Sequence, residues 1–171
     1  MSMPLGGRAR RLGDDVNTDY IITSARKKAT IDEQVLKRYL LETVDPGFAT
    51  SVLPGDVLVA GHNFGCGSAM EVAATVILAA GIRAVIAQSF SRTFYRNAVN
   101  NGLLPIECDT SGIGEGDAIS VESSGTRVIV RDETTGAAVA GTVPSGIAAR
   151  ILSAGGLVPY LRTAGRFEQA R

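Results

Sequence analysis

Short apolar runs alternate with amphipathic segments through the first two thirds of the chain. The runs at 56–61, 84–87 and 104–107 are short and mostly apolar, which is typical of buried strands. After the first run the apolar residues recur at helical spacing, as Val72, Ala73, Val76, Ile77 and Ala80. The pattern therefore predicts a strand, a loop and a helix in succession.

Three other segments have the apolar spacing of helices. Thr30 and Glu33 form a capping-box pattern that predicts a helix over 31–42, ended by an Asp-Pro-Gly turn. Helices are also predicted over 91–100 and 147–154, and each is followed by glycine, which commonly terminates a helix.

A β-rich section follows the alternating part. Residues 118–121 and 127–131 predict two paired strands joined through Gly125. Alternating strands and helices followed by a β-rich section predict an α/β fold with a mixed sheet, as a sandwich or a barrel.

A chain of 171 residues accommodates one sizeable hydrophobic core. We expect a single domain over 11–163, an N-terminal segment over 1–10 and a C-terminal tail over 164–171, mobile from residue 165.

The composition narrows the classes of function. Lys plus Arg and Asp plus Glu both number 17, which argues against nucleic acid or an anionic membrane as the main partner. No apolar run approaches the roughly 18 residues of a membrane span, and no secretory signal is evident. The two cysteines, Cys66 and Cys108, lack metal-ligand spacing, so we expect free thiols, no metal site and a cytoplasmic protein.

The most informative motif lies at the junction of the first strand and its helix. There Gly65, Cys66, Gly67 and Ser68 form a turn whose backbone amides could hold an anion. A second interpretation is structural, because Ser68 and Glu71 also have the spacing of a capping box. A serine-hydrolase elbow and a phosphate-binding P-loop are both excluded, since the glycine pattern of the first and the lysine of the second are absent.

Four blocks of the chain, at 13–22, 45–49, 62–71 and 89–103, resemble the swivel domain of the aconitase superfamily. In particular they resemble the small subunits of isopropylmalate isomerase (3-isopropylmalate dehydratase) and homoaconitase. The resemblance implies an aconitase-type swivelling β/β/α domain that works in a heterodimer, in leucine biosynthesis or a related pathway. It also implies a large subunit that carries a 4Fe–4S cluster, and a small hydroxy acid as substrate.

The resemblance also suggests roles for individual residues. Ser68 falls on the family's proton-abstracting serine, and Thr18 and Asp19 fall on a pair that lines the active site. For Asp19 the alternative is a loop residue that bonds its own backbone. The candidates for substrate binding are Gly65, Cys66, Gly67, Ala69, Met70, Thr18, Arg26, Lys27 and Lys28. The three cations share one role, contact with a substrate carboxylate.

The motif departs from the family where relatives carry Ser-Ser-Arg-Glu-His. This chain has Ala69, Met70 and Val72 at the second, third and fifth positions. An arginine that grips a carboxylate is therefore missing, which favours a specialised 2-hydroxy-acid dehydratase, of homoaconitase or another type, over an ordinary leucine-pathway subunit. An assembly module that has lost substrate binding is the remaining alternative.

Three further residues have open roles. Arg92 and Arg96 lie one helical turn apart and form either a surface pair or a contact to the serine loop or the large subunit. His62, the only histidine, is more typical here of a surface or hinge residue than of a proton-transfer group.

Overall fold

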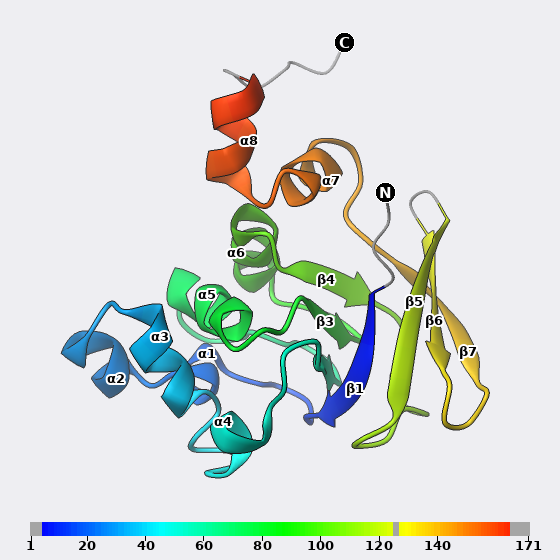
Figure 1. Ribbon diagram of the computed structural model, residues 1–171, viewed down its shortest axis with the longest axis horizontal. Coiled ribbons are helices and arrows are strands. Elements are labelled where there is room, and N and C mark those ends of the chain that lie inside the picture. Colours follow the sequence, from blue (N-terminus) through cyan, green and yellow to red (C-terminus); the bar gives the residue numbers. More distant parts are fainter. Residues whose placement is uncertain (1–4, 125–126, 165–171) are drawn as a thin grey trace.

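The computed structural model describes residues 5–124 and 127–164, and its centre is a closed β-barrel (Figure 1). Around the barrel the strands follow the order β1-β2-β3-β4-β7-β6-β5. Their bounds are β1 Leu5–Arg11, β2 Val57–Ala60, β3 Ala84–Ala87, β4 Leu104–Glu107, β5 Ala118–Ser124, β6 Arg127–Asp132 and β7 Ala138–Thr142.

The barrel has a parallel and an antiparallel part. Strands β1 to β4 run parallel to one another, and β5, β6 and β7 pair antiparallel with one another. The barrel closes where β5 pairs with β1 and where Glu107 of β4 faces Thr142 of β7. The mixed barrel confirms the predicted fold class. Strands β1 and β7 were not predicted. Strands β2 to β6 match the predicted strands, and the predicted join at Gly125 lies outside the described residues.

Helices cover the parallel part. In Figure 1 the short helices α1 to α4 gather at one end of the molecule, α5 and α6 lie beside the parallel strands, and α7 and α8 continue beyond α6. Their bounds are α1 Thr18–Ile21, α2 Ser24–Ala29, α3 Glu33–Leu36, α4 Phe48–Ser51, α5 Glu71–Ala79, α6 Arg92–Asn101, α7 Gly146–Ser153 and α8 Leu157–Ala164. No helix in the described part of the chain is long and apolar enough to cross a membrane.

Alternation along the parallel strands explains why their sequences are continuously apolar. In β2, Val57 and Val59 belong to the core inside the barrel, whereas Leu58 and Ala60 belong to the core under the helices. Because successive side chains point to opposite faces, a strand buried on both faces has no polar position.

The helix predicted over 31–42 is only partly correct: the chain is helical over 33–39, and the predicted start and end are wrong. Thr30 ends α2 instead of starting a helix, and Asp32 caps α3 by accepting a hydrogen bond from the N–H of Gln34 at 2.9 Å. After α3 the chain continues as a 3-10 helix over Lys37–Tyr39 and turns at Leu41, whose φ is +56°. Thr30 and Asp32 are both residue types that cap helices, so the sequence allowed a helix to start after either one. Tertiary packing selected Asp32.

The predictions for the other helices hold with small shifts. The α6 helix begins after Ser91, whose hydroxyl accepts from the N–H of Phe94, and ends at Gly102 in the left-handed conformation. The α7 helix ends before Gly155, as predicted. The α8 helix was not predicted, and the tail expected from residue 165 lies outside the described residues.

A carboxylate buried at the start of β2 joins strands β1 and β2. Asp56, 4% exposed, accepts hydrogen bonds from Arg8 at 2.7 and 3.2 Å and from the N–H of Leu53 at 2.9 Å. A guanidinium nitrogen of Arg10 lies 3.6 Å away. Burial alone would raise the pKa of Asp56, but the bonds from Arg8 and Leu53 and the two positive charges outweigh it, so the pKa is lowered.

This network predicts a pH-dependent loss of stability in Asp56→Asn. A carboxyl whose pKa is lowered on folding stabilises the protein above its unfolded-state pKa, and that contribution disappears as the pH falls through the folded-state pKa. We expect Asp56→Asn to lower the free energy of unfolding at pH 7 by about 1.5–3 kcal/mol. The difference from wild type should shrink below about pH 4, the ordinary pKa of aspartate.

Urea denaturation at pH 7 and pH 3.5 measures this difference. Asp45→Asn is the control, because Asp45 is exposed and accepts only a backbone hydrogen bond. A loss of stability that is the same at both pH values would show that the charge of Asp56 does not contribute.

Candidate functional site

The loop between β2 and α5 is held by the segment that precedes α1. The N–H of Gly65 donates to the carbonyl of Val16, and the N–H of Thr18 donates to the carbonyl of Cys66, both at 2.8 Å. The hydroxyl of buried Thr18 donates to the carbonyl of Ser68, also at 2.8 Å. The backbone on both sides of Gly67 is therefore fixed, although the two segments are about 50 residues apart.

Glycine is required twice in this loop. Gly65 and Gly67 have φ of +80° and +93°, which side chains rarely adopt. A Cβ atom at Gly65 would overlap the Phe94 side chain, and one at Gly67 would lie 2.6 Å from the side-chain nitrogen of Asn17. The loop can pack this closely only because both positions lack a side chain.

Asp19 is positioned by two residues that the sequence analysis did not select. The side chain of Asn17 accepts a hydrogen bond from the N–H of Asp19 at 2.9 Å, and the hydroxyl of Ser24 donates to the Asp19 carboxylate at 2.8 Å. The self-bonding loop role considered for Asp19 thus belongs to Asn17, which caps α1. The cap-type residue before the Thr-Asp pair was a signal that could have identified Asn17.

Ser68 is exposed, and its hydroxyl makes no hydrogen bond to any residue in the described part of the chain. The capping-box interpretation of Ser68 and Glu71 is wrong. Helix α5 begins at Glu71 with Met70 in the capping position, and no side chain caps it. Because α5 begins at Glu71, Ser68 lies too far before the helix to cap its first amides. The Ser68 hydroxyl is therefore available to a substrate.

The three candidate cations lie on α2 and have different surroundings. Arg26 donates to both carboxylate oxygens of Glu42, at 2.8 and 3.0 Å, and stacks on Tyr39 with its guanidinium carbon 3.7 Å from the ring centre. The hydrogen bond from Arg26 lowers the pKa of Glu42. Lys28 is exposed, whereas Lys27 is half-buried and its ammonium lies 3.0 Å from the sulfur of Met70.

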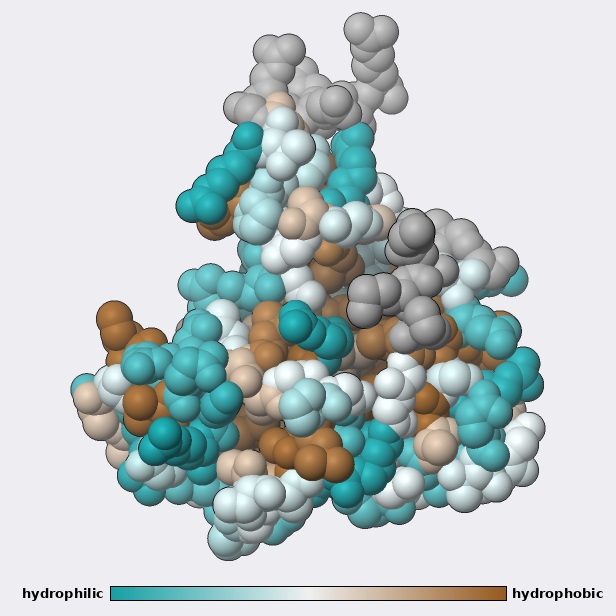
Figure 2. Space-filling view, in the orientation of Figure 1, coloured by the Kyte–Doolittle hydropathy of each residue, from teal (hydrophilic) through white to brown (hydrophobic). Residues whose placement is uncertain are grey.

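Lys27 and Met70 line one cleft, with a volume of about 520 Å³, between α2, α3 and the start of α5. Ala69, Leu36 and Val72 contribute to its lining. Met70 is only 4% exposed, so its side chain forms part of the wall. The cleft combines the Lys27 ammonium with two carboxylates, Glu33 and Glu71, and with apolar side chains on part of its wall. In the view of Figure 2, apolar residues extend across the middle of the molecule beside α5, with polar residues over α2.

Cys66 and His62 stand near Ser68 in the sequence but differ in environment. Cys66 is half-buried, and burial, followed by the negative charge of Asp15, raises the pKa of its thiol. His62 is exposed, and its backbone N–H donates to Asp14. Within 5–124 and 127–164, no group of three or more His, Cys, Asp or Glu side chains is placed to hold a metal ion.

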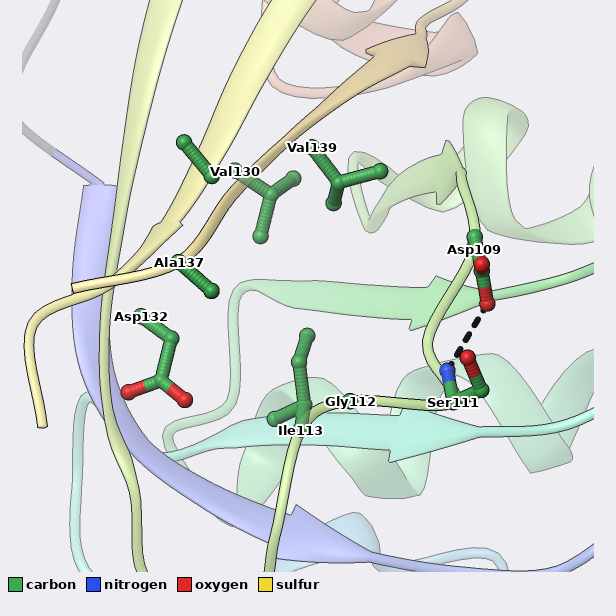
Figure 3. A pocket seen from close by; sticks show the side chains of 9 residues that line it. Asp109, Ser111, Gly112, Ile113, Val130, Asp132, Ala137 and Val139 are labelled. Atoms are coloured by element: carbon green, nitrogen blue, oxygen red, sulfur yellow. Dashed lines mark hydrogen bonds between the residues drawn. The ribbon is translucent and has the colours of Figure 1, made fainter. Parts of the chain in front are cut away.

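A second cavity, of about 270 Å³, lies between strands β6 and β7 and the loop that follows β4 (Figure 3). Figure 3 shows Val130 and Val139 of strands β6 and β7 facing the loop that carries Ile113. Asp132 also lines it, but its carboxylate accepts hydrogen bonds from the N–H groups of Thr134 and Thr135 and from the Thr135 hydroxyl. Asp132 therefore serves the turn between the strands.

Comparison with known proteins identifies the fold and the family. Residues 18–111 match the family model of the aconitase C-terminal domain. Over 160 residues the chain is 42% identical to the methanogen homoaconitase small subunit of Methanocaldococcus jannaschii, covering 94% of this chain and 92% of the relative. It is 43% identical over 159 residues to the 3-isopropylmalate dehydratase small subunit of Desulfovibrio desulfuricans, covering 91% and 94%.

A solved structure supports the same assignment. The crystal structure of 3-isopropylmalate dehydratase from Methanocaldococcus jannaschii superposes with a TM-score of 0.91 at 41% identity, covering 95% of this chain and 96% of that one. The fold is that of an aconitase swivel domain. The chain belongs to the aconitase C-terminal domain family, in the group of small subunits of 3-isopropylmalate dehydratase and homoaconitase.

Proposed function

We propose that this chain is the small subunit of a two-component iron–sulfur hydro-lyase that removes water from a 2-hydroxy acid and adds it back, with Ser68 as the proton-abstracting base. One observation carries the assignment of the base. Ser68 is exposed, and its hydroxyl has no hydrogen-bond partner among the described residues, whereas the rest of its loop is held by hydrogen bonds. Asp19, on the adjoining segment, completes the catalytic pair.

A serine hydroxyl needs help to act as a base, because its alkoxide form is strongly disfavoured at neutral pH. The backbone amides that begin α5, three residues after Ser68, have no partner within the helix and carry a partial positive charge. These groups favour the alkoxide, which takes the proton from the carbon next to a substrate carboxylate.

The iron–sulfur cluster is expected on the partner subunit. Cys108 is buried at the end of β4, and burial, followed by the charge of Asp109, raises the pKa of its thiol to about 11. Cys66 is the only other cysteine. Clusters of this kind are held by several thiolates, so the residues of this chain do not fit one. The names of the relatives as small subunits support a large partner that supplies it.

In this proposal Lys27 binds the substrate carboxylate. Arg26 is committed to Glu42, and Lys28 does not line the cleft, so Lys27 is the cation best placed to replace the missing family arginine. Because Met70 presents a soft apolar surface beside it, the cleft suits a malate-like acid with an uncharged substituent. 3-Isopropylmalate also has such a substituent, so the preference for a specialised relative within the hydro-lyase family rests on the missing family arginine at position 70 and not on the apolar surface.

The substitution Lys27→Gln should raise KM for the hydroxy acid by tenfold or more, because a charge-assisted hydrogen bond contributes about 1.5–3 kcal/mol. Lys28→Gln, on the same helix, is the matched control and should leave KM within about twofold. Steady-state kinetics of the complex with its large subunit measures both. If the two substitutions change KM equally, then Lys27 does not bind the substrate carboxylate.

The choice of substrate is tested with the wild-type complex, assayed on 3-isopropylmalate and homocitrate beside smaller substituted malates. Efficient turnover of 3-isopropylmalate would contradict the specialisation but would leave the hydro-lyase assignment intact.

A further inference from the structure

A groove of about 500 Å³ lies between the start of α6 and the end of β4, and the proposed reaction does not use it. It is lined by Phe90, Arg92, Tyr95, Arg96 and Glu107. Arg92, Tyr95 and Arg96 lie on one face of α6 because residues three and four positions apart are neighbours on a helix. The groove therefore has two cationic side chains along one wall, aromatic rings beside them and one carboxylate.

The positions of Arg92 and Arg96 lower the stability of helix α6. Both are exposed, and neither forms an ion pair within the described part of the chain. Like charges one turn apart repel each other. Arg92 is also the first residue of α6, where the positive end of the helix dipole disfavours a cation, and the first turn contains no acidic residue. An arrangement that costs stability indicates a binding role for the pair.

The aromatic wall of the groove is continuous with the serine loop. Phe90 contacts Tyr95 and Phe64, both with ring centres 6.0 Å apart, and the Phe64 ring also packs on Phe94. Ser91, between Phe90 and Arg92, donates its hydroxyl to the carbonyl of Gly65 at 2.7 Å. Any partner bound in the groove therefore lies against the support of the catalytic loop.

We propose that this groove docks a carboxylate-bearing segment of the large subunit, and this inference rests on the proposed function. Arginine and aromatic residues are enriched at the energetic centres of protein interfaces. Two guanidinium groups suit carboxylates that bind in a bidentate manner. Glu107 disfavours a free anion such as phosphate in the same groove and suits a peptide, which also presents N–H donors. Docking here places the partner beside the loop that carries Ser68.

The test is the affinity between purified small and large subunits, measured by biolayer interferometry at 50 and 300 mM salt. The charge reversal Arg92→Glu with Arg96→Glu should weaken association at least tenfold at low salt and reduce its salt dependence. The neutral pair Arg92→Gln with Arg96→Gln should give a smaller loss in the same direction. At saturating small subunit, kcat of the neutral pair should equal that of wild type.

The control is Arg83→Glu. Arg83 is exposed and directly precedes β3, so it lies at the opposite end of that strand from Phe90. Its reversal should leave association unchanged. Thermal unfolding of each variant excludes misfolding.

Two results would overturn the docking site. One is equal affinity of wild type and both double variants. The other is a lower kcat of the neutral pair at saturation with unchanged affinity, which would assign the arginines to catalysis. Failure of the wild-type subunits to associate would instead reject the proposed function together with its docking site.

Discussion

Replacing Ser68 by alanine should lower kcat of the complex by about 10²–10⁴-fold, the usual contribution of a positioned proton-transfer group. KM should change little, because the carboxylate contact belongs to Lys27 in the proposed site. The hydroxyl makes no hydrogen bond within the described residues, so its removal leaves no buried group unsatisfied. The melting temperature and the affinity for the large subunit should therefore stay at their wild-type values.

Kinetics of dehydration and solvent-proton exchange, with the thermal transition of the free subunit, separate these effects. The matched control is Ser123→Ala, because Ser123 is an exposed serine of β5 in the antiparallel part of the barrel. Full activity of Ser68→Ala would show that Ser68 is not the proton-abstracting base. Tight association of the wild-type subunits without turnover of any hydroxy acid would instead support the assembly module considered as the alternative.

Replacing Gly65 by alanine should lower the free energy of unfolding by about 2–4 kcal/mol. Two costs add together. The backbone φ of +80° is unfavourable for alanine, and the new Cβ would lie only 2.7 Å from a ring carbon of Phe94, closer still to the inner atoms of that side chain. Phe94 is 1% exposed and packs on Phe64, so it has no free space into which to move. Activity should fall as well, because the loop that carries Ser68 must shift.

Gly136→Ala separates the two costs. Gly136 has the same φ of +80°, yet a Cβ there would meet no atom within 4 Å. Its substitution should cost only about 1 kcal/mol, the strain of the left-handed conformation. Urea denaturation of both variants gives the comparison. If the two substitutions destabilise the protein equally, then contact with Phe94 does not constrain the loop.

Local patterns predicted secondary structure well where a segment had one clear apolar period and one possible start and end. The strands at β2 and β3 and the helix α6 follow from apolar period and from single clear ends, such as Ser91 and Gly102. Capping boxes were less reliable, since both proposed ones, at Thr30 and at Ser68, proved wrong. Several residues near each helix start could serve as caps, and which one does so depends on where packing directs the chain.

The roles of the candidate site residues remain predictions. The structure joins Thr18 to the glycine loop by one main-chain hydrogen bond, to Cys66, and by one from its side-chain hydroxyl, to Ser68. The amino-acid pattern selected Thr18, Asp19 and this loop. It could not rank the three cations of α2. Arg26 is turned to Glu42 and Lys27 to Met70, and those partners lie 16 and 43 positions along the chain.

The sequence by itself determined the α/β class, most strands, the helices α5, α6 and α7, the family and the glycine positions of the serine loop, because these depend on local period and on short motifs. Only the tertiary structure decided that β1 joins the barrel, that Ser68 is left without a capping role and that Lys27 faces the cleft. Closure of the barrel and the directions of side chains depend on contacts between distant segments. Their free energies are set by packing and burial, which no local pattern contains.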